Sequence, residues 1–343
     1  MMEAHTLDAW TRPSDRASSV FRDAMLLAGF AAPLFLWLAG VALVLAAEAA
    51  VARGRSRREA AESVCRRGLE IFILAFLFRL QAFIVSPGAH PITLFRVDIL
   101  NIMGPAIAAG GLIWLVSRSR AVMLGIYAAV ATGFAMLTPL ARAATPIGRL
   151  PIWVQWYIRP SGDNTTFTGF PWAGFVFAGA AAGVLIVAGR ESRAGSRTHV
   201  QLAFAGVLTI AAGFSATWLP SIYAESSFWT TSPTFFAMRV GVLMTAFAAM
   251  YFIERFLADR RDVLSPLARF GRHSLFVYWI HVELVYGYAT WALHRRLPFW
   301  GAVTAYATFA ALMYAAVVLR DRVAEAWRLS DRQMSLQHKV EPV

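Results

Sequence analysis

The chain has 343 residues, of which 58% are hydrophobic and 15% charged, and its mean hydropathy is +0.54. A soluble domain is closer to half apolar and a quarter charged, so this composition excludes an ordinary soluble protein. The net charge of +12 would suit a nucleic-acid partner, but the positive residues lie in loops between apolar stretches, which argues against that class.

Nine stretches are apolar over the roughly 20 residues that a helix needs to cross a bilayer. They predict an all-α fold, a polytopic transmembrane helix bundle that forms a single integral-membrane domain over residues 1–343. An extracytoplasmic segment (1–23) would precede the bundle (24–320), and a cytoplasmic tail (321–343) would follow it. The nine predicted spans are 24–51, 68–87, 93–116, 121–139, 169–189, 199–217, 233–254, 274–293 and 301–320.

The loops between these spans differ in their positive charge. Of the 32 Lys and Arg residues, 21 fall in alternate loops and the C-terminal tail, and only eight on the other side. Cytoplasmic loops carry the excess of Lys and Arg, so we expect the C-terminus in the cytoplasm, in a bacterial inner membrane.

The N-terminus does not fit this orientation. Nine spans would leave Met1 outside, and the polar sequence MMEAHTLDAWTRPSDR is not a signal peptide. We therefore expect that a first helix is missing upstream, and ten spans would return both ends to the cytoplasm.

Aromatic residues gather on the predicted outer side. The loop 140–168 contains Trp153, Trp156 and Tyr157, and Trp172 opens the next span. An aromatic belt at the membrane interface would explain them. A sugar-binding platform is the functional alternative, and both can hold for different residues.

Small residues recur in the span 169–189, at Gly174, Gly179 and Gly183. We expect them to let neighbouring helices approach closely. A narrow groove for an acyl or pantetheine chain is the alternative.

Charged residues inside the membrane are costly and mark pairs, cavities or substrates. Arg96 and Asp98 are two residues apart and would not face one another on a helix, so each needs a partner elsewhere. Arg79 and Arg239 could pair or snorkel, or bind the phosphates or carbonyl of an acyl donor.

Two histidines are catalytic candidates. His281 lies in the apolar sequence SLFVYWIHVELVYGY and is either a hydrogen-bonded core residue or a catalyst. His5 has Asp8 three residues later on the same helix face, where a carboxylate would fix its tautomer and raise its basicity. The single cysteine, Cys65, has no His cluster around it in the sequence, so we expect no metal.

Six segments in order resemble the membrane acyltransferases related to heparan-α-glucosaminide N-acetyltransferase. They are EAHTLDAW (3–10), GFAAPLFLWLAGVALVLA (29–46), FRVDILNIMGPA (95–106), FPWAGFVFAGAAAG (170–183), SPTFFAMRVGVL (232–243) and FGRHSLFVYWIHVELVYG (270–287). The family pattern opens with a helix reading Asp-x-x-Arg-Gly, which is absent here, in agreement with the odd number of spans.

The resemblance implies acyl transfer, with acetyl the expected group, from cytoplasmic acyl-CoA to an amine or hydroxyl of an extracytoplasmic sugar or glycolipid. In the eukaryotic relative a histidine is essential, and His5 matches it best. It would be a general base or transient acyl acceptor, with Asp8 or Asp98 orienting it. Arg79 or Arg239 would contact acetyl-CoA.

Two other function classes stay open. One is a transporter or flippase of small molecules or lipid-linked sugars, although the two halves lack matching Gly- or Pro-broken helices. The other is a non-catalytic membrane partner of a glycan-processing enzyme. The expected partners are membrane lipids and a glycan acceptor but no nucleic acid, and a homo-oligomer is compatible with the sequence.

Overall fold

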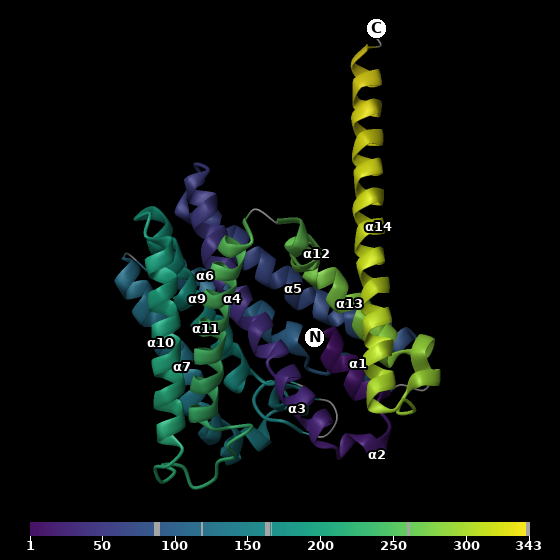
Figure 1. Cartoon of the computed structure of the whole chain (residues 1–343). Helices are drawn as coiled ribbons and strands as arrows, with labels where there is room; N and C mark the ends of the chain where they lie inside the picture. Colours follow the sequence, from purple (N-terminus) through teal and green to yellow (C-terminus); the bar gives the residue numbers. More distant parts are fainter. Residues whose placement is uncertain (86–89, 118, 162–164, 166, 259–260, 341–343) are drawn as a thin grey trace. The chain divides into compact units, whose positions relative to one another are not determined.

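The structure, a computed structural model, describes the backbone of residues 1–85, 90–117, 119–161, 165, 167–258 and 261–340. The ordered elements in this part are helical, which confirms the predicted all-α fold (Figure 1). In chain order they are α1 (Met2–Trp10), α2 (Pro13–Arg16), α3 (Ser19–Ala28), α4 (Ala31–Ala52), α5 (Arg57–Val85), η1 (Pro91–Phe95), α6 (Ile99–Val116), α7 (Arg120–Ala143), η2 (Thr145–Arg149), α8 (Ile152–Gln155), α9 (Gly169–Glu191), α10 (Gly195–Ala216), α11 (Pro233–Phe256), α12 (Arg261–Arg272), α13 (Ser274–Tyr286), η5 (Tyr288–Leu293) and α14 (Phe299–Val340).

Seven helical stretches in the described residues are long and apolar enough to cross a membrane, which confirms a polytopic bundle. Of the nine predicted spans, those at α5 and α13 are not among the seven. With 13 residues, α13 extends about 20 Å, less than the roughly 30 Å of hydrocarbon. The seven stretches are Ser19–Ala52, Ile99–Val116, Arg120–Ala143, Gly169–Glu191, Gly195–Ala216, Pro233–Phe256 and Phe299–Trp327.

Several predicted span ends differ from the helix ends, each for a local reason. In the span predicted from residue 93, the α-helix begins only at Ile99, after the 3-10 helix η1, because Asp98 caps α6 in an extended conformation. The span predicted to residue 293 ends at Tyr286, where Gly287 is extended. The expected cytoplasmic tail continues α14 as a helix to Val340. Residues 341–343 and the last two positions of the predicted span 68–87 lie outside the described residues.

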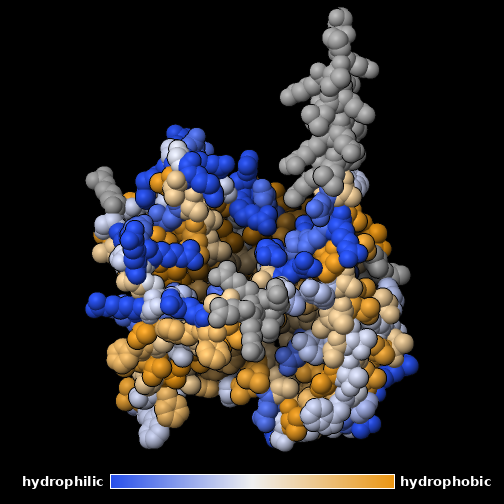
Figure 2. All heavy atoms as spheres, turned by 45° about the horizontal axis from the view of Figure 1, so that its top comes forward, coloured by the Kyte–Doolittle hydropathy of each residue, from blue (hydrophilic) through white to orange (hydrophobic). Residues whose placement is uncertain are grey.

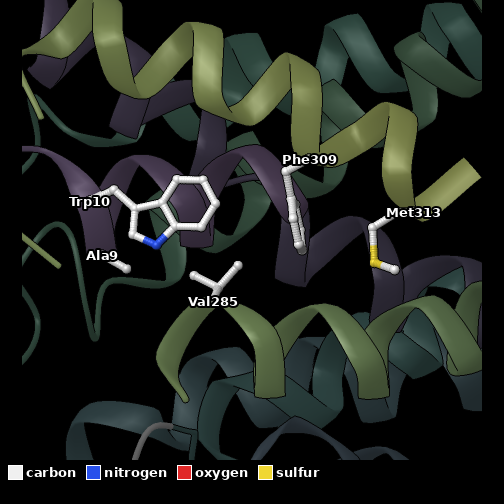
Figure 3. Close-up of a cluster of buried hydrophobic side chains, with 5 residues drawn as sticks. All are labelled: Ala9, Trp10, Val285, Phe309 and Met313. Carbon is white, nitrogen blue, oxygen red and sulfur yellow. The ribbon is translucent and has the colours of Figure 1, made fainter. Parts of the chain in front are cut away.

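The chain divides into two compact units, Met1–Gly29 with Phe256–Val343, and Phe30–Arg255. In the first unit, α1 packs against α13 and α14. Figure 3 shows the buried cluster between them, formed by Ala9 and Trp10 of α1, Val285 of α13, and Phe309 and Met313 of α14. The Trp10 and Phe309 rings meet edge to face with centroids 5.7 Å apart.

Backbone hydrogen bonds join the end of α1 to the segment before α14. Arg295 N–H donates to the Ala9 carbonyl (2.9 Å), and Leu297 N–H donates to the Trp10 carbonyl (2.9 Å). Arg12 N–H donates in turn to the Leu297 carbonyl (2.8 Å). These bonds fix the short helix that carries His5 and Asp8.

Asp15 fixes the same region through its side chain. Its Oδ1 accepts from Arg12 Nε (2.7 Å) and its Oδ2 from the N–H of Phe299, the first residue of α14 (2.9 Å). The hydrogen bond from Arg12, followed by that from Phe299, lowers the pKa of Asp15 below its ordinary value of 3.8.

A lowered pKa makes the Asp15 contribution to stability depend on pH. The contribution is fully present above the unfolded pKa and is lost as pH falls through the lower folded pKa. Asp15→Asn should therefore reduce the Tm at pH 7, and the difference from wild type should shrink below about pH 4. Thermal melts in detergent across pH 3–7 check this, and a difference that does not change with pH would contradict it.

In the second unit the most extensive contacts are between α4 and α9, α5 and α6, and α7 and α9. Gly40 of α4 faces the Val176 carbonyl of α9, and Gly179 of α9 faces the Trp37 carbonyl of α4, so closely that a Cβ at either position would overlap backbone. The predicted packing role of Gly174, Gly179 and Gly183 is confirmed, because side chains or backbone of other helices surround all three.

Large apolar side chains cover much of the surface on the face shown in Figure 2. Leu27, Phe204 and Leu312 are each more than 60% exposed, among many others. A soluble monomer rarely exposes so much apolar surface, whereas the hydrocarbon of a membrane would cover it.

Candidate active site

A chain of hydrogen bonds in the first unit links His5 to a carboxylate. His5 Nδ1 lies 3.0 Å from the Tyr286 hydroxyl, and that hydroxyl donates to Asp8 Oδ2 (3.3 Å). Asp8 Oδ1 in turn forms an ion pair with Arg16 NH2 (2.7 Å), while Arg16 NH1 donates to the Asp8 carbonyl. The predicted pair of His5 and Asp8 is thus brought together through Tyr286.

The directions of these bonds assign the His5 tautomer. The tyrosine proton points to the carboxylate, which can only accept, so the tyrosine oxygen accepts the Nδ1 proton of His5. The lone pair of the neutral imidazole is then on Nε2. A nitrogen base held this way suits proton abstraction or attack on an acyl carbon.

His281 also lies at this site. Its ring centroid is 5.3 Å from that of His5, and the Tyr286 ring lies 5.4 Å from His5 on its edge. His281 is 1% exposed, and its Nδ1 is 2.6 Å from the Val277 carbonyl one turn earlier. Two of the four predicted catalytic residues, His5 and His281, therefore have their rings side by side, with Asp8 one hydrogen-bond step away.

Asp98 lies in the second unit and forms a largely buried ion pair with Arg79, whose side chain is 13% exposed. Its Oδ1 also accepts from Ile99 N–H (2.7 Å), and its own N–H donates to Asn101 Oδ1 (2.9 Å), so it is a helix cap. These contacts support a structural role for the pair, in which two predicted site residues neutralise each other.

Removing one partner of this pair should be more harmful than removing both. Asp98→Asn leaves the largely buried Arg79 guanidinium without its counter-ion, at a cost of about 3–5 kcal/mol in unfolding free energy. Asp98→Asn with Arg79→Met keeps a capping side chain and no charge, so most of that loss should be recovered. A double-mutant cycle of melting temperatures measures the coupling; strictly additive effects would contradict it.

Arg239 of α11 is placed differently. Its guanidinium lies 4.0 Å from the centroid of the Phe235 ring, and its buried Nε has no hydrogen-bond partner among the described residues. Arg79 is neutralised by Asp98, whereas Arg239 forms no ion pair among the described residues, so Arg239 is better placed to bind an anionic group.

The four predicted substrate-binding rings are unevenly exposed. Trp153 is 50% exposed, whereas Trp156 is only 2% exposed and presents no open face. Trp172 packs edge to face on Phe167 (4.7 Å between centroids). Tyr157 accepts a hydrogen bond from Asn101 Nδ2 (3.4 Å), and burial raises the pKa of its phenol above 10.0.

Two residues of the site were not predicted, Tyr286 and Arg16. Tyr286 is the last residue of α13, and Arg16 is the last residue of α2. Tyr286 has the signal of a tyrosine at the end of an apolar stretch, which many interface residues share, and Arg16 lies in a polar segment that does not distinguish it. In the part of the chain that the structure describes, no three His, Cys, Asp or Glu side chains converge as metal ligands would.

A family model described as heparan-α-glucosaminide N-acetyltransferase, catalytic, matches residues 4–217. The chain belongs to this family. The match includes His5, Asp8, Arg79 and Asp98 and ends before α13, so it does not extend to His281 or Tyr286. No curated protein matches the chain.

Membership confirms the resemblance seen in the sequence. At the level of the family, the chain is an integral membrane protein of the acetyltransferase class. The matched residues include most of α1, the helix that carries His5.

Proposed function

We propose that this protein transfers an acetyl group from acetyl-CoA, supplied from the cytoplasm, to an amine or hydroxyl of a sugar or glycolipid on the opposite side of the membrane. The observation that carries the proposal is the hydrogen-bonded series from His5 through Tyr286 to Asp8, in which His5 and Asp8 lie within the residues that the acetyltransferase family model matches.

In this proposal His5 is the catalytic residue and Tyr286 and Asp8 position it. Asp8, held by Arg16, polarises the Tyr286 hydroxyl, which keeps the His5 proton on Nδ1. Nε2 then either takes the proton of the acceptor or attacks the thioester carbonyl carbon itself. In the second case the C–S bond breaks, the sulfur keeps the electron pair, and the acetyl group resides on Nε2 until the acceptor takes it.

The remaining assignments follow the charge and exposure of single residues. Arg239 is the preferred contact for the anionic part of acetyl-CoA, with Arg79 a second proposal despite its pairing with Asp98. Trp153 is the preferred face for a sugar ring because it is the most exposed of the predicted rings. The arginine-rich loops support a cytoplasmic C-terminus in a bacterial inner membrane.

Proteoliposomes test the direction of transfer. Labelled acetyl-CoA is added on the side of the arginine-rich loops, with glucosamine inside or outside the vesicles. We expect acetylglucosamine when donor and acceptor are on opposite sides. Transport of glucosamine without acetylation would contradict the proposal and favour a transporter.

A further inference from the structure

His281 has one ring nitrogen that the described residues leave without a partner. Its Nδ1 contacts the Val277 carbonyl at 2.6 Å, whereas its Nε2 is buried and makes no hydrogen bond. The side chain is 1% exposed and faces the His5 ring across 5.3 Å between centroids.

The local contact determines what Nε2 can do. A backbone carbonyl only accepts, so the proton of the neutral ring is on Nδ1 and the lone pair is on Nε2. Buried acceptors are rarely left unpaired because the lost hydrogen bond with water is not replaced. The missing partner of Nε2 must therefore be a hydrogen-bond donor.

The reacting groups of the two substrates differ in whether they carry a hydrogen-bond donor. The thioester group of acetyl-CoA has no N–H or O–H at its carbonyl, whereas the acceptor reacts through an amine or hydroxyl. The donor that Nε2 lacks thus has the chemistry of the acceptor and not that of the acyl group.

We propose that His281 is a second catalytic histidine, whose Nε2 binds the N–H or O–H of the acceptor and takes its proton as the acceptor is acetylated. This rests on the proposed function and selects the second of its two alternatives, in which His5 attacks the acyl carbon and His281 acts on the acceptor.

The proton and electron changes balance over one turnover. The amine lone pair attacks the acetyl carbonyl carbon and a C–N bond forms, while one amine proton moves to Nε2 of His281. The acetyl carbon has by then passed from the sulfur of CoA, which keeps the electron pair of the broken C–S bond, to Nε2 of His5, and the bond to Nε2 breaks as the amide forms. The His281 imidazolium releases its proton at the end, and the thiolate gains one, which gives an amide and free CoA.

The test compares His281→Gln with His199→Gln. His199 on α10 is also buried, and its Nδ1 makes the same contact with a carbonyl one turn earlier (2.7 Å), but its ring stacks on Tyr251. We expect His281→Gln to lower kcat/KM for glucosamine by about 10²–10⁴-fold while the Kd for acetyl-CoA stays unchanged. His199→Gln should leave both unchanged.

Chemical rescue separates a proton acceptor from a structural residue. His281→Gly leaves space for added imidazole, which should restore part of the transfer, whereas His281→Leu should not respond. Full activity of His281→Gln, or no rescue in a His281→Gly variant that still binds acetyl-CoA, would overturn the inference and leave the proposed function standing. A wild-type chain that transfers no acetyl group would remove both.

Discussion

His5→Ala is expected to abolish acetyl transfer to glucosamine, with a loss of about 10³-fold or more, while the protein still folds and inserts. The variant removes the imidazole that the Tyr286 and Asp8 series orients, and with it the base or acyl acceptor. Initial rates with labelled acetyl-CoA measure the effect.

Variants of the supporting residues should have smaller effects. Tyr286→Phe keeps the ring that packs on His5 but removes the hydroxyl, so we expect about a 10-fold to 100-fold loss in kcat. His294→Ala is the matched control for His5→Ala and should leave the activity unchanged. This histidine of the same unit stacks on Trp291 and is no part of the series. Activity of His5→Ala within a few-fold of wild type would remove His5 from the mechanism.

Gly179→Ala should produce the largest loss of stability among single methyl additions. The new methyl would overlap the Trp37 carbonyl of α4, and Gly40→Ala would overlap the Val176 carbonyl of α9. Backbone cannot move aside as a side chain can, so helices α4 and α9 must separate. We expect a cost of about 3 kcal/mol or more in unfolding free energy.

Glycines of α7 provide the matched control. Gly125 and Gly133 are also in a helix, but a methyl on either would meet nothing within 4 Å. Their change to Ala should raise stability by about 0.5–1 kcal/mol, because Ala loses less backbone entropy on folding. Melting temperatures in detergent decide the matter, and equal shifts for Gly179→Ala and Gly125→Ala would contradict the packing account.

Much of the fold could be predicted because lipid requires long apolar helices, and their composition is visible in the sequence. The packing role of Gly179 could be predicted as well, because small residues at helical spacing within a membrane span usually let neighbouring helices approach closely. The start of α6 could not be predicted from hydrophobicity, because it depends on the Asp98 cap. The end of α13 could not either, because it depends on the extended backbone of Gly287.

The site could be predicted only in part. His5 and Asp8 are three residues apart on one helix, so their proximity is local. Tyr286 lies more than 270 positions further along the chain and reaches His5 only because α1 packs on α13. The pairing of Arg79 with Asp98 likewise depends on how α5 and α6 meet, which the sequence pattern of either helix does not reveal.

Acetyl-CoA binding and CoA release by the purified protein test the central claim most directly. The measurement uses the purified chain with and without glucosamine. We predict saturable acetyl-CoA binding, and CoA release that glucosamine accelerates and His5→Ala abolishes. Folded protein that neither binds acetyl-CoA nor releases CoA would contradict the account.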